Sequence, residues 1–184
     1  STEIYNILSL IPQDQTFDQV GGCGNLPFNT QSYYSLDVSS FTDRFPSFIL
    51  RELLSVMYGN HLSESIMNIL CGFPFWSSDT NDFLSYSVGN PMGSRASWAL
   101  TTLCHHLIMF LACENLNLTF LQARYKMLGD DIVIWDDLLK AEYLTIINML
   151  GISISLQKSF VSPNGFTFAK RLFSKYGDLS PISF

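Results

Sequence analysis

The sequence predicts an α+β domain in which an antiparallel sheet is covered by helices on one face. Residues 33–38 are aromatic and β-branched, as in a strand, and two short apolar runs around Gly129 are typical of a hairpin at 125–135. Helical apolar spacing separates these strands and also follows the hairpin. The resulting order is βαββαβ-like, and such a layout gives an antiparallel sheet with helices packed on one side.

The other elements follow in chain order. Helical patterns occupy residues 3–10, 46–58, 63–70, 95–114 and 137–150, with Asp136 or Asp137 as the cap of the last one. Further strand patterns occupy residues 83–88, 152–156 and 166–173, and turns are expected at 39–43, 77–82 and 163–165. The longest apolar segment, 98–113, is about 16 residues long, short of the ~20 that span a bilayer. We therefore expect a buried helix there and no membrane span.

Charge and cysteine spacing argue against several classes. The chain has 184 residues, enough for one domain with a core, and its net charge of −6 argues against a general nucleic-acid binder. No Lys or Arg precedes Arg44, so the N-terminal stretch has neither an Arg-rich transit peptide nor an apolar secretory segment. No cysteines form a CxxC pair, which argues against a zinc site or a redox dithiol; reduced thiols are expected at Cys23, Cys71, Cys104 and Cys113.

The Gly129-Asp130-Asp131 step is the best candidate for a functional site. Gly129 allows a sharp turn, which leaves two adjacent carboxylates at the hairpin tip. Solvent or a cation must relieve their repulsion, and carboxylate oxygens suit Mg²⁺ or Mn²⁺. Asp37 ends the strand at 33–38, so it joins the other two acids at one sheet edge if that strand pairs beside the hairpin. A solvated, Asp-rich turn is the alternative.

Three acids in this arrangement are what two-metal phosphoryl transfer needs. Two cations about 3.5–4 Å apart activate an attacking 3′-hydroxyl and stabilise the leaving pyrophosphate. No His or Cys is required in such a mechanism. A small cyclase-like enzyme shares the carboxylate geometry, but it does not predict the glycine loop at 89–94.

Several segments of the chain form a recognisable series. They are residues 35–46, residues 89–98 with the following His105-His106, residues 126–134, residues 150–159 and residues 168–171. In this order they resemble motifs A, B, C, D and the succeeding motif of a viral RNA-dependent RNA polymerase palm, specifically that of the mitovirus (narnavirus-like) family. Residues 13–19 also resemble the approach to motif A. Gly-Asp-Asp alone is weak evidence, whereas the ordered series is specific, and the resemblance covers most of residues 11–173.

The resemblance implies roles for four aspartates and one lysine at the site. Asp37 and Asp130 would be the main metal ligands and Asp131 a supporting one, with Mg²⁺ or Mn²⁺ as the cofactor. Lys158 would lie near the pyrophosphate as a cation or proton donor; a surface lysine is the alternative. Asp43 would favour a ribose 2′-hydroxyl, and its alternative is a cap on the helix that begins near residue 46.

The resemblance also implies contacts with substrate and RNA. The glycine loop 89–94 would bring backbone close to the template or the nascent base pair, and an ordinary loop before a helix is its alternative. The residues implied in these contacts are Gly89, Gly93, Ser94, Ser97, Lys170 and Arg171. For the last two, a solvated basic face is equally open. His105 and His106 are expected to be packed or surface helix residues rather than ligands.

Some positions depart from the family pattern. Phe41 stands where a small residue is usual, Asn90 replaces a usual Gln, and Arg95 stands where an aromatic residue is common. The helix after the glycine loop offers no Asn as a partner for Asp43, so Ser97 or a nearby hydroxyl is the candidate substitute.

The expected organisation is a lead-in from the fingers side at 1–32, a palm domain at 33–173 and a C-terminal tail at 174–184. The basic fingers and the thumb of a polymerase are expected to be absent from this chain, and other polymerase segments could supply them in trans. Two functions stay open. One is template-directed nucleotidyl transfer with an RNA template and nucleoside triphosphates. The other is a non-catalytic, genome-captured remnant that at most binds metal or RNA. The resemblance implies a mitochondrial location.

Overall fold

The computed structural model describes residues 2–19, 21–24, 26–28, 32–93 and 96–180. Its helices are α1 (Thr2–Ser9), α2 (Phe41–Arg44), α3 (Ser47–Tyr58), α4 (Asn60–Cys71), α5 (Ser97–Asn115), the 3₁₀ turn η1 (Phe120–Gln122) and α6 (Asp137–Met149). Its strands are β1 (Tyr33–Asp37), β2 (Phe75–Ser77), β3 (Asp82–Leu84), β4 (Tyr125–Leu128), β5 (Asp131–Ile134), β6 (Phe160–Ser162), β7 (Gly165–Phe168), β8 (Arg171–Ser174) and β9 (Gly177–Asp178).

The central sheet has the strand order β4-β5-β1-β6, and the neighbouring pairs are antiparallel. The hairpin β4–β5 and the neighbouring strand β1 were both predicted from the sequence. In the register between β1 and β5, Tyr34 lies opposite Ile134 and Asp37 lies opposite Asp131. The first strand therefore pairs beside the hairpin, and its C-terminal acid ends level with the hairpin tip.

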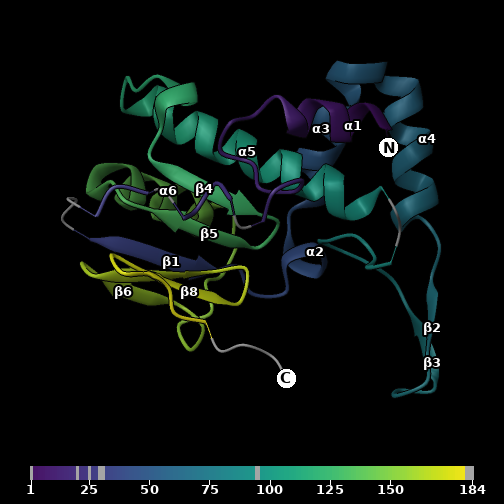
Figure 1. Cartoon of the computed structure of the whole chain (residues 1–184). Helices are drawn as coiled ribbons and strands as arrows, with labels where there is room; N and C mark the ends of the chain where they lie inside the picture. Colours follow the sequence, from purple (N-terminus) through teal and green to yellow (C-terminus); the bar gives the residue numbers. More distant parts are fainter. Residues whose placement is uncertain (1, 20, 25, 29–31, 94–95, 181–184) are drawn as a thin grey trace.

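The two faces of this sheet are covered differently (Figure 1). Alternate residues of β5 point to opposite faces, as strand geometry requires. Ile132 and Ile134 belong to the larger core cluster, which contains buried residues of α5 and α6. Val133 belongs to a smaller cluster with Phe166 and Phe168, on the three-stranded sheet β7-β8-β9. The predicted fold class is confirmed, with helices on one face and a small sheet on the other.

Local signals placed several elements correctly. The Asp136 side chain accepts a hydrogen bond from the Leu139 backbone N–H at 3.0 Å, so Asp136 is the cap of α6. Residues 166–173, for which a strand or a hairpin arm was expected, lie in the hairpin β7–β8. Among the described residues, no helix combines the length and the apolarity needed to cross a membrane.

The strand expected at 152–156 is wrong. In this segment only Ile154 forms a bridge, to Val38, and the strand that pairs with β1 is β6. The Ser155 carbonyl accepts hydrogen bonds from the backbone N–H of Lys158 and Ser159 and from the Ser159 hydroxyl. These local bonds turn the chain before it can extend along β1.

Two smaller expectations were also wrong. Residues 39–43 were expected as a turn, but residues 41–44 form the short helix α2 after Ser40, which has a positive φ of 49°. The turn expected at 77–82 is present at 78–81, but the strand β2 before it was not expected, and its partner β3 is shorter than the strand expected at 83–88.

Candidate functional site

The three predicted acids meet at one end of the central sheet. Asp37 is the last residue of β1, Asp131 is the first of β5, and Asp130 lies in the turn that connects β4 and β5. The Val38 backbone N–H donates to the Asp130 carbonyl at 3.1 Å, which fastens the turn to the end of β1. The expectation that the acids converge is therefore confirmed by the strand order and register.

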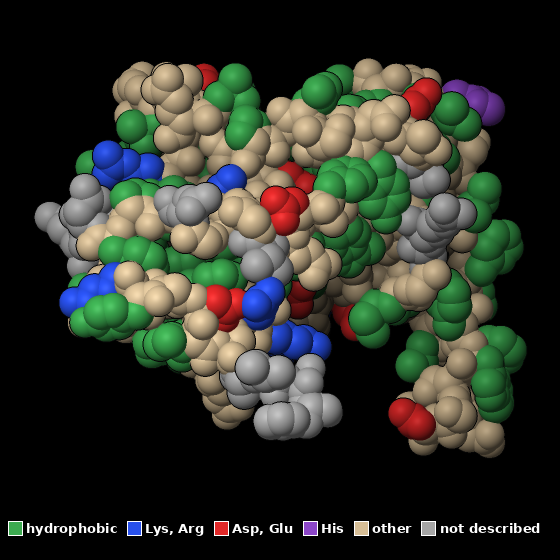
Figure 2. Space-filling model, viewed as in Figure 1, with side chains coloured by type: hydrophobic (Ala, Val, Ile, Leu, Met, Phe, Trp, Pro, Cys, Tyr) green, Lys and Arg blue, Asp and Glu red, His purple; other side chains and the backbone are tan. Residues whose placement is uncertain are grey.

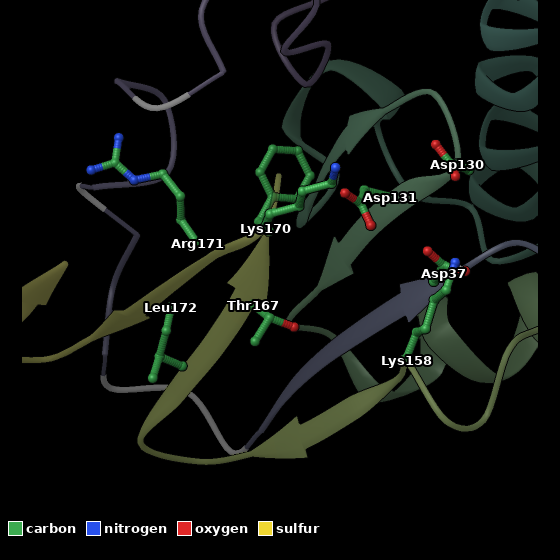
Figure 3. Close-up of a pocket in the computed structure, with 9 residues that line it drawn as sticks. Asp37, Asp130, Asp131, Lys158, Thr167, Lys170, Arg171 and Leu172 are labelled. Atoms are coloured by element: carbon green, nitrogen blue, oxygen red, sulfur yellow. Dashed lines mark ion pairs between the residues drawn. The ribbon is translucent and has the colours of Figure 1, made fainter. Parts of the chain in front are cut away.

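The acids line a pocket of about 540 Å³ together with residues from the C-terminal hairpin (Figure 3). Its lining consists of Asp37, Asp130, Asp131, Lys158, Thr167, Phe168, Lys170, Arg171 and Leu172. Figure 2 shows acidic and basic side chains beside one another in this part of the surface. The pocket therefore combines carboxylates that suit a cation with ammonium groups that suit a phosphate.

Burial and mutual repulsion raise the pKa values of two of the carboxylates, Asp130 and Asp131. Burial raises the pKa of Asp131 from an ordinary 3.8 to about 6, and the negative charges of Asp130 and Asp37 add to the effect. Burial and the charge of Asp37 also raise the pKa of Asp130, against a lowering by the backbone N–H of Asp130 and by nearby lysines. Ionising Asp130 and Asp131 in this pocket is therefore unfavourable for the folded protein, and a bound cation would offset that free-energy cost.

The basic residues of the pocket hold different positions. The Lys158 Nζ lies 3.4 Å from Asp37 Oδ1, and its side chain is 68% exposed. Lys170 sits in the two-residue turn between β7 and β8, where it and Ala169 both have positive φ, and its side chain extends toward Asp131 (Figure 3). Arg171 points away from the carboxylates and pairs with Asp178. Lys158 and Lys170 therefore face the acids, and Arg171 does not.

The donor set fits a divalent cation by its chemistry. Carboxylate oxygens are the ligands that Mg²⁺ and Mn²⁺ prefer, and Asp37, Asp130 and Asp131 supply them in one pocket. Within the described part of the chain, however, no three His, Cys, Asp or Glu side chains are grouped closely enough to hold one ion. The pocket thus has the right donors, but as they stand they are not gathered around one point.

The glycine loop packs against the segment that follows β1. A Cβ on Gly89 would lie 2.1 Å from the Asp43 carbonyl oxygen, so this glycine permits a close approach to the protein's own backbone. Asn90 is fully buried, and its amide donates to the Thr42 carbonyl at 3.3 Å and to Thr101 Oγ1 at 3.2 Å. Ser97 donates to Asn90 Oδ1. The loop is therefore tied to α2 and α5 through buried polar contacts.

The end of the glycine loop opens into a second pocket, of about 410 Å³, beside the first. It is lined by Val38, Ser40, Phe41, Thr42, Met92, Gly93, Ser97, Trp98, Asp130 and Lys158. Asp130 and Lys158 line both pockets. Gly93 and Ser97 thus line a pocket together with Asp130, and their contacts with substrate or RNA stay a prediction. Ser94 lies outside the described residues.

Asp43 is placed differently from the other acids. Its carboxylate accepts a hydrogen bond from the Tyr86 hydroxyl at 3.0 Å, and neither pocket includes it in the lining. It does not cap α3 either, because the N-cap of that helix is Pro46 and no side chain bonds there. Its partner Tyr86 was missed by the sequence analysis, which expected a hydroxyl from the helix after the loop.

Two further contacts at the site were missed. Trp98 packs under the hairpin tip, where a Cβ on Gly129 would lie 2.8 Å from Trp98 Nε1. The Ala169 backbone N–H donates to the Asp131 carboxylate, which lowers its pKa against the larger effect of burial. An apolar helix residue and a backbone amide carry no chemical signal in a sequence. His105 and His106, in contrast, are each 1% exposed, as expected for packed residues.

Comparisons with known proteins agree with this geometry. The family described as mitovirus RNA-dependent RNA polymerase matches residues 1–184. The RNA-directed RNA polymerase of Cryphonectria parasitica mitovirus 1 is 35% identical over 92% of this chain and 21% of its own length. An uncharacterized mitochondrial protein of Arabidopsis thaliana is 36% identical over 97% of this chain and 75% of its own length.

A solved structure shares the fold. The RNA-dependent RNA polymerase of a human picorbirnavirus superposes with a TM-score of 0.66 at 17% identity, over 94% of this chain and 35% of that one. The chain therefore spans about a fifth of the viral relative and about a third of the solved structure. With the family match along its whole length and the palm-like sheet, this chain belongs to the mitovirus RNA-dependent RNA polymerase family.

Proposed function

We propose that residues 33–173 are the palm domain of an RNA-dependent RNA polymerase and catalyse template-directed nucleotidyl transfer. The observation that supports this most is the strand register, which sets Asp37 opposite Asp131 and brings Asp130 into the same pocket. Mg²⁺ or Mn²⁺, when bound, would activate the primer 3′-hydroxyl and neutralise charge on the phosphates. Asp37 and Asp130 would be the main ligands, and Asp131 would support them.

The residues around the acids fit the rest of the transfer. The primer 3′-oxygen attacks the α-phosphorus of a nucleoside triphosphate, loses its proton, and displaces pyrophosphate. Lys158 lies between the two pockets, where its ammonium can neutralise the pyrophosphate or give it a proton. The second pocket, with Gly93 and Ser97, would take the incoming nucleotide. Lys170 would contact primer phosphates; Arg171 would do so only after leaving Asp178.

The remaining polymerase functions belong to other segments in this proposal. Residues 1–32 would lead in from the fingers side, and residues 174–184 would follow the palm. Segments that grip the triphosphate and the duplex would act together with this chain, either in cis or in trans. Asp43 would act on the ribose 2′-hydroxyl only if it exchanges its bond to Tyr86. Mitochondrial relatives support a mitochondrial location.

Primer extension tests the proposal. The chain is incubated with an RNA template, a primer, nucleoside triphosphates and Mg²⁺ or Mn²⁺, alone and with the other polymerase segments of a mitovirus relative. Incorporation is expected from the wild type and from Asp79→Asn, an exposed acid on the loop between β2 and β3. It is expected to be lost in Asp130→Asn and Asp131→Asn. Equal incorporation by all four proteins would refute the assignment of the site.

A second function is a folded, non-catalytic remnant. Two features favour it: the described residues hold no ready-made metal cluster, and Phe41, at a position where the family has a small residue, is buried beside the site. This reading expects no incorporation under any combination of segments. Binding of Mn²⁺ that Asp130→Asn weakens would then identify a retained metal site without turnover.

A further inference from the structure

A buried histidine on α5 bonds to the hairpin tip. His105 is 1% exposed, and its Nδ1 lies 2.9 Å from the Gly129 carbonyl oxygen. Its Nε2 lies 2.8 Å from the Tyr143 hydroxyl on α6. The function proposed above assigns no role to this ring, although it joins two helices to the turn that carries Asp130.

The partners of the ring determine its tautomer. The Gly129 carbonyl can only accept, so Nδ1 must carry the proton and donate. Nε2 is then a lone pair that accepts from the Tyr143 hydroxyl. Burial lowers the pKa of His105 to about 3, so the ring is neutral in the physiological range. His105 is therefore a fixed hydrogen-bond donor.

The bond acts on the peptide group that precedes Asp130. The carbonyl of Gly129 and the N–H of Asp130 belong to one planar unit, so holding the first orients the second. The same planar unit includes the Cα of Asp130, from which its side chain leaves the backbone. The following carbonyl, of Asp130, accepts from the Val38 N–H at 3.1 Å. Both peptide planes beside Asp130 are thereby fixed, one by α5 and the other by β1.

We propose that His105 is a positioning residue that sets the direction of the Asp130 carboxylate through the Gly129–Asp130 peptide. The inference rests on the proposed function of the site, because the direction of the Asp130 carboxylate matters only if that carboxylate binds a metal. The Gly129 carbonyl sets the tautomer, and the Tyr143 hydroxyl bonded to Nε2 helps to hold the ring in place, in the way that outer partners orient metal-binding groups. Without the hydrogen bond from His105, the Gly129–Asp130 peptide group can rotate, and the Asp130 carboxylate is no longer held in one direction.

The neighbouring histidine provides a matched control. His106 is also 1% exposed, but its Nδ1 contacts the Tyr125 hydroxyl at 2.9 Å and its Nε2 contacts Asp14 Oδ2 at 3.0 Å. These partners lie at the start of β4 and in the lead-in, away from the hairpin tip. Loss of His106 therefore disturbs the same helix and core without touching the Gly129 carbonyl.

The experiment compares His105→Phe, which removes the donor, with His105→Asn, whose amide nitrogen replaces Nδ1, and with His106→Phe. Mn²⁺ affinity of the folded chain is measured by titration calorimetry, and kcat and KM by primer extension. We expect His105→Phe to weaken Mn²⁺ binding and kcat by about 10- to 100-fold, as outer-partner changes do. His105→Asn should recover most of both, and His106→Phe should lower only the melting temperature. Equal losses in the two Phe variants would overturn the inference.

Nitrogen NMR on the labelled chain gives a readout independent of metal and turnover. It should find His105 in the Nδ1–H tautomer, and Tyr143→Phe should keep this tautomer, because the Gly129 carbonyl alone requires a donor at Nδ1. The Nε2–H tautomer in the wild type would overturn the inference. If the wild type binds no metal and incorporates nothing, the proposed function fails. The tautomer and the shift of the Asp130 amide in His105→Asn still decide the role of His105.

Discussion

The substitution Asp131→Asn should stabilise the fold while it damages the site. Asn keeps the shape of the side chain and an oxygen that accepts from the Ala169 N–H, but it carries no charge. Burial and the charges of Asp130 and Asp37 raise the pKa of Asp131 to about 6 from an ordinary 3.8. The folded protein therefore holds this carboxylate in a place where its ionised form is disfavoured.

The size of the effect follows from the pKa. Each pKa unit is worth ~1.4 kcal/mol, so ionising Asp131 costs the folded state at most ~3 kcal/mol. The side chain keeps partial contact with water, which reduces the figure, and we expect a gain of ~1–2 kcal/mol for the Asn variant at neutral pH. Because the folded pKa is the higher one, the wild type loses stability as the pH rises from about 4 through about 6. The difference between the two proteins should therefore vanish below about pH 4.

Urea unfolding followed by tryptophan fluorescence, at intervals between pH 4 and pH 8, measures this difference. Asp79→Asn, which removes one acid from an exposed loop, controls for the change in net charge. Added Mn²⁺ should stabilise the wild type by RT ln(1 + [L]/Kd), or ~2.7 kcal/mol at a hundredfold excess over Kd, and the Asn variant by less. A variant at neutral pH that is no more stable than the wild type would refute the electrostatic account of the pocket.

Three further predictions concern other parts of the molecule. Gly89→Ala should destabilise the fold by about 1–3 kcal/mol, because the new Cβ would meet a backbone carbonyl of α2. Gly24→Ala is the control, since its Cβ would meet nothing within 4 Å, and thermal melting compares the two variants. Lys158→Met should raise the pKa of Asp131 further, as read from pH profiles of incorporation. It should also change kcat, which falls, by a larger factor than the KM for nucleotide. Trp76, 57% exposed on the projecting hairpin β2–β3, should promote self-association of the isolated chain, and light scattering should find less of it in Trp76→Ser (Figures 1 and 2).

The elements that carry the acids could be predicted because their signals are local. The apolar runs around Gly129 specify a hairpin, and the aromatic, β-branched residues before Asp37 specify a strand. With a βαββαβ-like order, Asp37 meets the hairpin tip if its strand pairs beside the hairpin, and the register between β1 and β5 shows this pairing. The cap at Asp136 is equally local, since one side chain and one backbone N–H make it.

The parts that failed depend on partners distant in sequence. The alternation at 152–156 was typical of a strand, but the bonds to the Ser155 carbonyl turn the chain, and β6 takes the place beside β1. The hydroxyl that bonds Asp43 comes from Tyr86, which no spacing rule connects to it. His105 was correctly expected to be packed, yet its bond to the Gly129 carbonyl appears only when α5 lies across the hairpin. The sequence shows which side chains can form hydrogen bonds, but it does not show which distant group each of them bonds to.

The cost of the acids bears on the choice between a working palm and a remnant. The core on both faces of the sheet is complete without them, and at neutral pH the ionised Asp131 opposes folding. A protein near its stability threshold gains from losing such a charge, so a fold free of catalytic demands has no reason to keep it. This chain carries all three acids, and it also buries His105 against the one peptide group that orients Asp130. A destabilising charge with its own support is what a functional site requires, and this favours the catalytic reading.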